Sequence, residues 1–514
     1  MTTVIIPTVG IGSRMNPFTT DLNKALLPYK NKPILAHIID QFPIDSRFII
    51  PIGHLSQQIV DFCELAYADR DIEFVKIEDW TSSQSGTGTT LKQCANLISG
   101  PFWYVPCDTY FNQTFTELHE DCYFVHQLID DEESRLYTMF DIDADSKIKD
   151  ISFKQQTNHE WYAFTGLMHI ENHATFFDNL HSSNSNEFIA AITLGSKVRY
   201  LPTWLDFGNP EAYKDALANS QQFDFSKKNE ITYICNDRVV KWWLDKETAE
   251  KKFKKTGVMH FNRVIWPDNC EYQNNWFAYD YFPGKTLYDH NDPNIFPGLL
   301  DWLDKWLWQE NPNIETLFKV DCMNFYMTKT LNRVKLFKEK YPSLPKIRMV
   351  DGFPIDEADI ERINWSALIN NPRPGLFHGD LQFDNIIISD NKEIKLIDWR
   401  PDFGENECFG DIYYDLAKLS GGFIINYAMV KQGKIGLKID GESVSLDIPH
   451  IPNMSVYQNE LYTYMQGKKY NINKIKLLVP IIFLNMAPLH TAPFDQALWY
   501  LGLKLLHEAL LQPE

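Results

Sequence analysis

One stretch near the C-terminus, LFHGDLQFDNIIISDNKEIKLIDW, constrains the fold of this chain more than any other feature. It places Asp380 five residues before Asn385, and Asp398 thirteen residues after Asn385. The residues between Asn385 and Asp398 predict a strand, a tight turn and a second strand. Phosphoryl transfer from a nucleotide needs one carboxylate to orient a hydroxyl, with an amide and a second carboxylate to hold Mg²⁺. The spacing predicts these roles for Asp380, Asn385 and Asp398, while His378 is expected to brace the loop.

The length and composition indicate a folded, multidomain protein. A chain of 514 residues is too long for one core, so two or three domains are expected. The net charge of −19 argues against nucleic acid or an anionic membrane as the main partner. The eight cysteines form no CxxC pair, and no signal sequence is recognised. The longest apolar run, from Leu477, is too short to span a bilayer, which favours a cytoplasmic protein without membrane insertion.

The first half alternates strand and helix patterns, and this order predicts an α/β, Rossmann-like domain with a mainly parallel sheet. Ligands of such sheets bind beyond the carboxyl ends of the strands, where the loop Gly10–Arg14 and Asp108 are expected to lie. A polar stretch over 218–230 predicts the domain boundary, which gives domains at residues 1–222 and 228–514. The Gly- and Pro-punctuated segment 420–454 reads as an insertion or flap of unknown place.

A second nucleotide signature lies at the N-terminus, in VGIGSRMNPFTTDLNKALLP. Gly10 and Gly12 would let backbone N–H groups approach phosphates, and Arg14 and Lys24 would supply positive charge. A GxGxR loop alone is a weak signal, and an ordinary glycine turn explains it equally well. Together with an acid after a hydrophobic strand (Asp108) and the later WLDFGNP, the pattern resembles the sugar-nucleotide and phosphocholine nucleotidyltransferases.

That resemblance implies roles for individual residues. Gly10, Gly12 and Arg14 would bind triphosphate, Lys24 would contact phosphate, and Asp108 with Asp206 would hold Mg²⁺. Lys154 is a candidate cation for the incoming phosphate, and Gly86 lies in the stretch expected to line the base and sugar sites. The chain departs from the family where Asn23 replaces a proline and Asn209 a threonine, which leaves the nucleotide preference open.

The second half resembles the aminoglycoside phosphotransferase and choline kinase superfamily, which implies an α+β, bilobal, protein-kinase-like fold. Lys241 would anchor ATP phosphates together with Glu247 or Glu250, although a solvated charged helix explains these glutamates equally well. Main-chain groups near Asp280–Phe282 would take the adenine. Arg400, close to the acceptor site, would favour an acidic or phosphorylated acceptor unless Asp402 or Glu405 neutralises it.

The two resemblances imply a bifunctional kinase and nucleotidyltransferase. It would phosphorylate a small alcohol, choline or ethanolamine by analogy, with ATP, and would couple the phosphate to a nucleotide from CTP or another NTP. The product would be an activated precursor for a capsule or lipopolysaccharide. One alternative is a sugar or polyol kinase joined to a sugar-1-phosphate nucleotidyltransferase that uses UTP or GTP. Another is one active domain beside a non-catalytic nucleotide-binding module. The expected partners are nucleotides and small molecules, and oligomerisation is left open.

Overall fold

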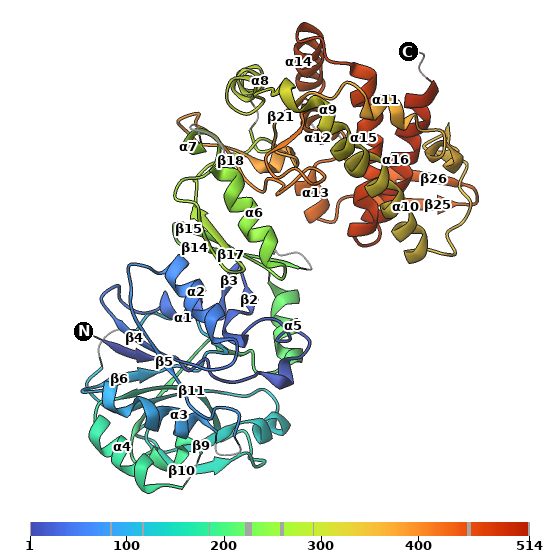
Figure 1. Ribbon diagram of the computed structural model, residues 1–514. Coiled ribbons are helices and arrows are strands. Elements are labelled where there is room, and N and C mark those ends of the chain that lie inside the picture. The colour runs from blue at the N-terminus through green and yellow to red at the C-terminus, as the bar shows by residue number, and fades with distance from the viewer. Residues whose placement is uncertain are drawn as a thin grey trace. The chain divides into compact units, whose positions relative to one another are not determined.

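In the computed structural model, strand β1 lies in the interior of a sheet (Figure 1). This sheet has nine strands within the part of the chain that the structure describes. Strands β4 and β6 pair with β1 in parallel, and β5 continues the parallel part beyond β4. On the other side β11 pairs antiparallel with β6, β8 and β9. The strands are β1 (Thr3–Ile5), β4 (Arg47–Ile52), β5 (Asp71–Lys76), β6 (Phe102–Tyr104), β8 (Cys122–His126), β9 (Thr138–Ile142), β10 (Ile148–Phe153), β11 (Tyr162–Ile170) and β12 (Lys197–Tyr200).

The structure describes residues 2–82, 85–115, 118–184, 186–220, 229–257, 262–290, 292–449 and 454–511. Two compact units make up the chain. The first unit comprises Met1–Lys246 and Gln273–Ala278, and the second comprises Glu247–Tyr272 and Tyr279–Glu514. The boundary predicted between residues 222 and 228 lies outside the described residues.

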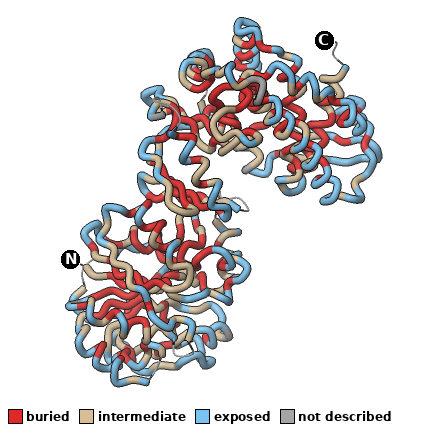
Figure 2. The backbone as a smooth tube through the Cα atoms, in the orientation of Figure 1, coloured by how far each residue is buried: buried red, intermediate tan, exposed pale blue. Residues whose placement is uncertain are grey.

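Helices cover both faces of the sheet because the side chains of its central strands alternate between two cores. Val4 and Ile6 belong to the core under α1 (Ile34–Ile39) and α2 (Ser56–Ala66). Ile5 belongs to the core under α3 (Thr87–Cys94) and α4 (His173–Ser182). Figure 2 shows the resulting band of buried backbone through the sheet. The parallel part of the sheet thus has two apolar faces, as the alternating strand and helix pattern predicted.

The hairpin of β14 (Glu230–Cys235) and β15 (Arg238–Trp243) packs into the first unit, although the sequence placed it at the start of the second domain. The ring of Phe62 on α2 lies 5.7 Å from that of Tyr233 and 5.8 Å from that of Trp276. The backbone N–H of Ile234 donates to the carbonyl of Asn31 over 2.7 Å. These contacts make the hairpin part of the core beneath α2, which explains why the compact unit continues to Lys246.

The second unit is mainly helical (Figure 1). Its helices include α6 (Lys246–Thr256), α8 (Ile295–Trp306), α9 (Glu315–Cys322), α10 (Lys329–Lys340), α12 (Ile412–Gly422), α14 (Met454–Gly467), α15 (Ile472–Met486) and α16 (Phe494–Leu511). A small three-stranded sheet has the order β18 (Lys285–Thr286), β22 (Ile386–Ile388) and β23 (Ile394–Leu396). The predicted strand–turn–strand after Asn385 is thus confirmed as the β22–β23 hairpin.

The segment 420–454, which the sequence analysis interpreted as an insertion or flap, contains regular secondary structure. It contains the end of α12, the helix α13 (Tyr427–Lys431) and the hairpin of β25 (Gly436–Asp440) and β26 (Ser443–Asp447). Strand β26 pairs in parallel with β19 (Met349–Val350), so the hairpin extends a sheet of the second unit.

One stretch among the described residues, Ile472–Leu489, is long and apolar enough to cross a membrane by length and composition alone. It includes α15, which contains Pro480, and 61% of the stretch is buried inside the protein. Core helices of folded proteins meet the same criterion, so this is weak evidence for a membrane span.

Candidate active sites

The loop after β1 brings the predicted phosphate-binding residues of the first unit together. Gly12 has φ of +68°, in the left-handed region that glycine adopts readily, and a Cβ atom there would lie 3.2 Å from Cβ of Lys24. Asn23 fixes the start of the next turn: its Nδ2 donates to the carbonyls of Thr8 and His54 over 3.0 and 2.7 Å. The buried side chain of Asn23 therefore braces this loop, at a position where the sequence resemblance implied a proline.

Two short strands bring the predicted metal ligands Asp108 and Asp206 together. Strand β13 (Leu205–Asp206) pairs with β7 (Thr109–Tyr110), with Asp206 opposite Thr109. Gly208 lies between the two acids: a Cβ atom added to it would be 2.9 Å from Oδ1 of Asp206, 3.1 Å from Oδ2 of Asp108 and 3.8 Å from Nη2 of Arg14. Only a residue without a side chain leaves this space open.

The charges of this centre are strongly coupled. Nζ of Lys24 lies 2.6 Å from Oδ2 of Asp108. Burial alone would raise the pKa of Asp108, but the Lys24 ammonium, with help from Arg14, lowers the pKa overall. The pKa of Asp206 is raised by burial and then by the negative charge of Asp108, while a hydrogen bond from Tyr137 opposes the rise. Two acids that repel each other beside two cations are suited to hold a divalent ion on phosphates.

The other residues predicted for this site lie around it. Gly10 is exposed and open, with no heavy atom within 4 Å of where its Cβ would be. Gly86 precedes α3 and is packed against the backbone of Asn186. Lys154 is exposed, and its backbone N–H donates to the carbonyl of Tyr137, the residue that also bonds Asp206. Their functional roles remain predictions.

In the second unit, the loop that carries Asp380 and the β22–β23 hairpin bring together the three residues predicted from spacing. Nδ2 of Asn385 donates to the backbone carbonyl of Asp380 over 2.8 Å. The N–H of Ile397 donates to the carbonyl of Asn385 over 3.0 Å, so Asp398 follows directly beside Asn385. Asp398 has φ of +59°, an uncommon conformation for a residue with a side chain and one that concentrates at functional sites.

A buried network fixes the loop that carries Asp380. Oδ2 and Oδ1 of Asp415 accept the backbone N–H groups of His378 and Gly379, each over 2.7 Å. Nε2 of His378 donates to the carbonyl of Ile397 over 2.8 Å, and its Nδ1 accepts the N–H of Asp380. Burial lowers the pKa of His378 to about 3, so the ring is neutral at physiological pH. The bracing role predicted for His378 has a clear geometric basis.

Lys418 is a residue of this site that the sequence analysis did not single out. Its Nζ lies 2.8 Å from Oδ1 of Asp380, and its side chain is almost fully buried. Burial would lower the pKa of Lys418, but the charge of Asp380 raises the pKa overall. Lys418 lies three residues after Asp415 on α12, on the same face of the helix. The spacing of Asp415 and Lys418 in YYDLAKL is the sequence signal that could have identified Lys418 as a residue of this site.

The segment after Asp398 is held by the charged helix α6. Nζ of Lys252 donates to the carbonyl of Trp399 over 2.6 Å, and Nζ of Lys255 donates to that of Arg400 over 2.9 Å. Both lysines are buried, and burial lowers the pKa of Lys255 to about 7. One face of α6 therefore supports the segment that follows Asp398, the candidate metal ligand. This face of α6 is not the solvent-exposed charged surface that the sequence analysis considered as an alternative.

The remaining candidates for ATP binding have other contacts. Nζ of Lys241 on β15 lies 3.2 Å from Oε1 of Glu230, within the first unit. Glu250 pairs with Lys254 over 3.0 Å. The backbone N–H of Asp280 donates to the carbonyl of Asp268 over 2.9 Å, and Phe282 is half-buried. The roles of Lys241, Asp280 and Phe282 in binding ATP remain predictions.

Each centre offers two protein oxygen ligands, which suits Mg²⁺ because this ion usually keeps waters and takes further ligands from phosphates. In the first unit these are the Asp108 and Asp206 carboxylates. In the second they are Asp398 and the amide oxygen of Asn385, whose Nδ2 is already bound to Asp380. Among the described residues no group of three or more His, Cys, Asp or Glu side chains forms a metal cluster. The donor sets therefore fit Mg²⁺ shared with a nucleotide rather than a closed structural metal site.

Comparisons with known proteins agree with the division of the chain into two functionally different parts. Residues 340–431 match the model of the Phosphotransferase enzyme family (APH), a range that includes Asp380, Asn385 and Asp398. The Bifunctional protein GlmU of Methanococcus vannielii is 30% identical over 115 residues, and that of Methanococcus maripaludis is 28% identical over 116 residues. Each match covers 22% of this chain and 26% of the relative, so the chain spans about a quarter of the length of these curated relatives.

Solved nucleotidyltransferases also match at low identity. A putative glucose-1-phosphate thymidylyltransferase from Bacillus anthracis is 18% identical, with a TM-score of 0.37, over 44% of this chain and 98% of that one. The CTP:phosphocholine cytidylyltransferase from Streptococcus pneumoniae is 17% identical, with a TM-score of 0.35, over 42% and 99%. The chain joins a nucleotidyltransferase-like part to a kinase-like part of the phosphotransferase type, as the sequence predicted.

Proposed function

We propose that the protein is a bifunctional enzyme with a nucleotidyltransferase centre in its first unit and a small-molecule kinase centre in its second. One observation carries the proposal: each unit contains two candidate oxygen ligands for a metal and a close pair of a lysine and an aspartate. Asp108 and Asp206 lie around Gly208 beside Lys24, and Asp398 and Asn385 lie on the hairpin that follows Asp380 and its partner Lys418.

At the kinase centre, Asp380 orients the acceptor hydroxyl and takes its proton. The hydroxyl oxygen bonds to the γ-phosphorus of ATP, the bond from that phosphorus to the bridging oxygen breaks, and ADP leaves. Mg²⁺, held by Asn385 and Asp398, would neutralise charge on the phosphates. Asp415 and His378 keep the loop rigid, so that Asp380 is already in position when the acceptor binds.

At the nucleotidyltransferase centre, Arg14 and Lys24 bind the triphosphate beside Asp108 and Asp206. An oxygen of the phosphorylated substrate bonds to the α-phosphorus of an NTP, the bond to the bridging oxygen breaks, and pyrophosphate leaves. Positioning and neutralisation of charge supply most of the catalysis for such a reaction. Lys24 is paired with Asp108 in the free protein, so a bound divalent ion and triphosphate would give each of them a new partner.

The finer assignments rest on resemblance. CTP is the favoured nucleotide, choline or ethanolamine the favoured acceptor, and a precursor of a surface polysaccharide made in the cytoplasm the favoured product. A sugar or polyol kinase joined to a UTP- or GTP-dependent nucleotidyltransferase is the second candidate. Both candidates share the order of steps, first a phosphomonoester and then a nucleoside diphosphate derivative.

Phosphorus NMR tests this order directly. The full chain is incubated with Mg²⁺, ATP, one of the four NTPs and a panel of amino alcohols, polyols, hydroxy acids and sugars. We expect a new phosphomonoester signal, followed by a diphosphate diester and pyrophosphate with one preferred NTP. Product from sugars alone would select the second candidate. A phosphomonoester that never becomes a diester, with any NTP, would contradict the assignment of the first unit.

A further inference from the structure

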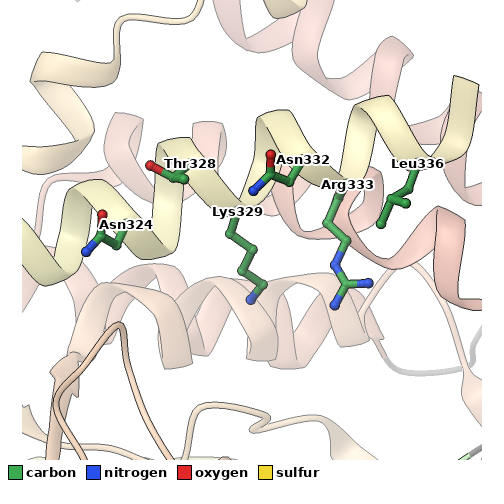
Figure 3. A pocket seen from close by; sticks show the side chains of 6 residues that line it. All are labelled: Asn324, Thr328, Lys329, Asn332, Arg333 and Leu336. Carbon is green, nitrogen blue, oxygen red and sulfur yellow. The ribbon is translucent and has the colours of Figure 1, made fainter.

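An open cavity of about 470 Å³ lies on the second unit, and the positively charged side chains of Lys329 and Arg333 are among those that line it. Its lining comes from one continuous helical stretch: Asn324, Thr328, Lys329, Asn332, Arg333 and Leu336. Figure 3 shows the Lys329 and Arg333 side chains extending from the same side of this stretch. The stretch begins with the π-helical turn η7 (Met323–Thr328), a rare conformation that is frequent at functional sites. The volume suits a small-molecule ligand.

Lys329 connects this cavity to Asp380. Its charged neighbours are Arg400, Lys418 and Arg333, together with the carboxylate of Asp380. Burial and then these three cations lower the pKa of Lys329 well below its usual value. This arrangement lowers the stability of the folded protein, because like charges four residues apart on a helix repel each other and because burying a charge costs free energy.

Arg400 belongs to the same group of charges. The guanidinium of Arg400 lies 5.1 Å from the ring centre of Phe325, and the ammonium of Lys329 lies 3.9 Å from the same ring. Nε of Arg400 is buried and makes no hydrogen bond. Gly379 keeps Arg400 close to the catalytic loop, since a Cβ atom on Gly379 would lie 2.8 Å from Cβ of Arg400.

Asp380 is the acid among the charged neighbours of Lys329, but no ion pair of the described residues includes Lys329, Arg333 or Arg400. Lys418 is already paired with Asp380. The acids that the sequence analysis considered as partners of Arg400 do not pair with it. Asp402 lies 3.9 Å from Lys251, and the carboxylate of Glu405 forms no ion pair with the described residues. The three cations are therefore left for a ligand.

We propose that the acceptor of the kinase is an alcohol that also carries an anionic group, a carboxylate or a phosphate, which Lys329, Arg333 and Arg400 bind next to Asp380. This inference rests on the proposed kinase function, and it replaces the choline-type acceptor that the resemblance alone favours with an anionic one. Positive alcohols such as choline and ethanolamine would meet like charges in this cavity. Lys329 has Asp380 among its charged neighbours, and Arg400 lies close to Gly379, the residue before Asp380. Lys329 and Arg333 lie outside residues 340–431, the range that matches the family model, and we expect features specific to the substrate outside that range.

Steady-state kinetics of the full chain test the inference, with D-glycerate, glycerol 3-phosphate, glycerol, ethanolamine and choline as acceptors. We expect glycerate or glycerol 3-phosphate to have a kcat/KM at least about 100-fold above that of glycerol or choline. The comparison between these two anions distinguishes a carboxylate from a phosphate. Preference for choline, ethanolamine or glycerol would overturn the inference.

The variant Arg333→Gln separates an acceptor site from a nucleotide site. It should raise KM for the anionic acceptor about tenfold or more, while KM for ATP stays within about twofold, because a charge-assisted hydrogen bond to the acceptor is lost. Lys335→Gln is the matched control, since Lys335 lies on the same helix, pairs with Glu339 and is exposed to solvent. A rise in KM for ATP alone would assign the cations to the nucleotide and overturn the inference.

Calorimetry separates failure of the inference from failure of the kinase function. If no alcohol is phosphorylated by the native chain, the kinase function fails, and titration with glycerate and glycerol 3-phosphate decides the anion site. Binding that Arg333→Gln weakens and Lys335→Gln does not would uphold the anion site. Equal or absent binding in all three proteins would overturn it.

Discussion

The ammonium group of Lys418 lies 2.8 Å from Oδ1 of Asp380. Asp415, one turn earlier on α12, accepts the backbone N–H groups of His378 and Gly379, the two residues before Asp380. One helix thus positions both the carboxylate that we propose to be catalytic and its counter-ion. Because the side chain of Lys418 is almost fully buried and that of Asp380 is only 32% exposed, the electrostatic effect of the pair is stronger than that of a fully exposed ion pair.

Replacing Lys418 should therefore impair the kinase step. We expect Lys418→Met to lower kcat for phosphorylation about 100-fold, since a charge near the reacting group is lost, with KM for ATP changed only a few-fold. Lys418→Arg, which keeps the charge, should recover part of the rate. Phosphorylation is measured by ADP release and nucleotidyl transfer by pyrophosphate release. Full kcat in Lys418→Met would show that the pair has no part in the reaction.

A methyl group at position 208 should close the space between the two acids of the first unit. In Gly208→Ala the new Cβ would lie 2.9 Å from Oδ1 of Asp206 and 3.1 Å from Oδ2 of Asp108, so we expect pyrophosphate release to fall at least about tenfold. ADP release by the second unit should be unchanged. Gly100→Ala is the control, because nothing lies within 4 Å of its added Cβ. Equal nucleotidyl transfer in both variants would contradict the predicted metal position.

His378 should make the stability of the protein depend on pH. Its pKa is about 3 when folded and 6.5 as a free side chain, so between these values the unfolded state binds a proton that the folded state does not. Stability is therefore lost as the pH falls below 6.5, by about 2 kcal/mol at pH 5. Urea unfolding at pH 7 and pH 5 measures this loss, which should be absent from His378→Gln. The raised pKa of Asp415, about 6, acts in the opposite direction, so the difference between the two proteins is the readout. The same loss in both would disprove the assignment.

Asn23 should contribute more stability than an ordinary helix-capping asparagine. Its side chain donates to two carbonyls and accepts the N–H of Ala25, and it is fully buried. We expect Asn23→Ala to cost about 2–4 kcal/mol, because buried polar groups lose their partners. Asn172→Ala, which removes one exposed capping bond to Thr175, should cost about 1 kcal/mol. Urea midpoints of the two variants compare these costs, and similar values would contradict the bracing role of Asn23.

Local patterns predicted much of the fold because they act over a few residues. Alternation in β1 placed Val4 and Ile6 on one face and Ile5 on the other, and the structure shows these two cores. The spacing from Asp380 to Asp398 predicted the β22–β23 hairpin. The hairpin of β14 and β15 was assigned to the second domain, but its contact with Phe62 depends on a residue far away in the sequence.

The charge partners could not be predicted in the same way. Lys252 and Lys255 appear in a run of charges that is typical of an exposed helix, and only the folded chain places them against the carbonyls of Trp399 and Arg400. Lys329 is separated from Asp380 by about fifty residues of chain, so no local spacing relates them. A sequence shows which side chains can carry charge, but the tertiary structure decides which charges meet.

The central claim is that the chain contains two independent phosphorus-transfer centres. It is tested most directly by replacing one aspartate of each centre with alanine, in separate variants. Asp380→Ala and Asp108→Ala are each given Mg²⁺, ATP, NTP and either the alcohol or its phosphomonoester, and the products are followed by phosphorus NMR. We predict that Asp380→Ala forms no phosphomonoester but still converts a supplied phosphomonoester to the diester. We predict that Asp108→Ala forms the phosphomonoester but does not convert it to the diester. Loss of both reactions in either variant, with folding intact by circular dichroism, would contradict the claim.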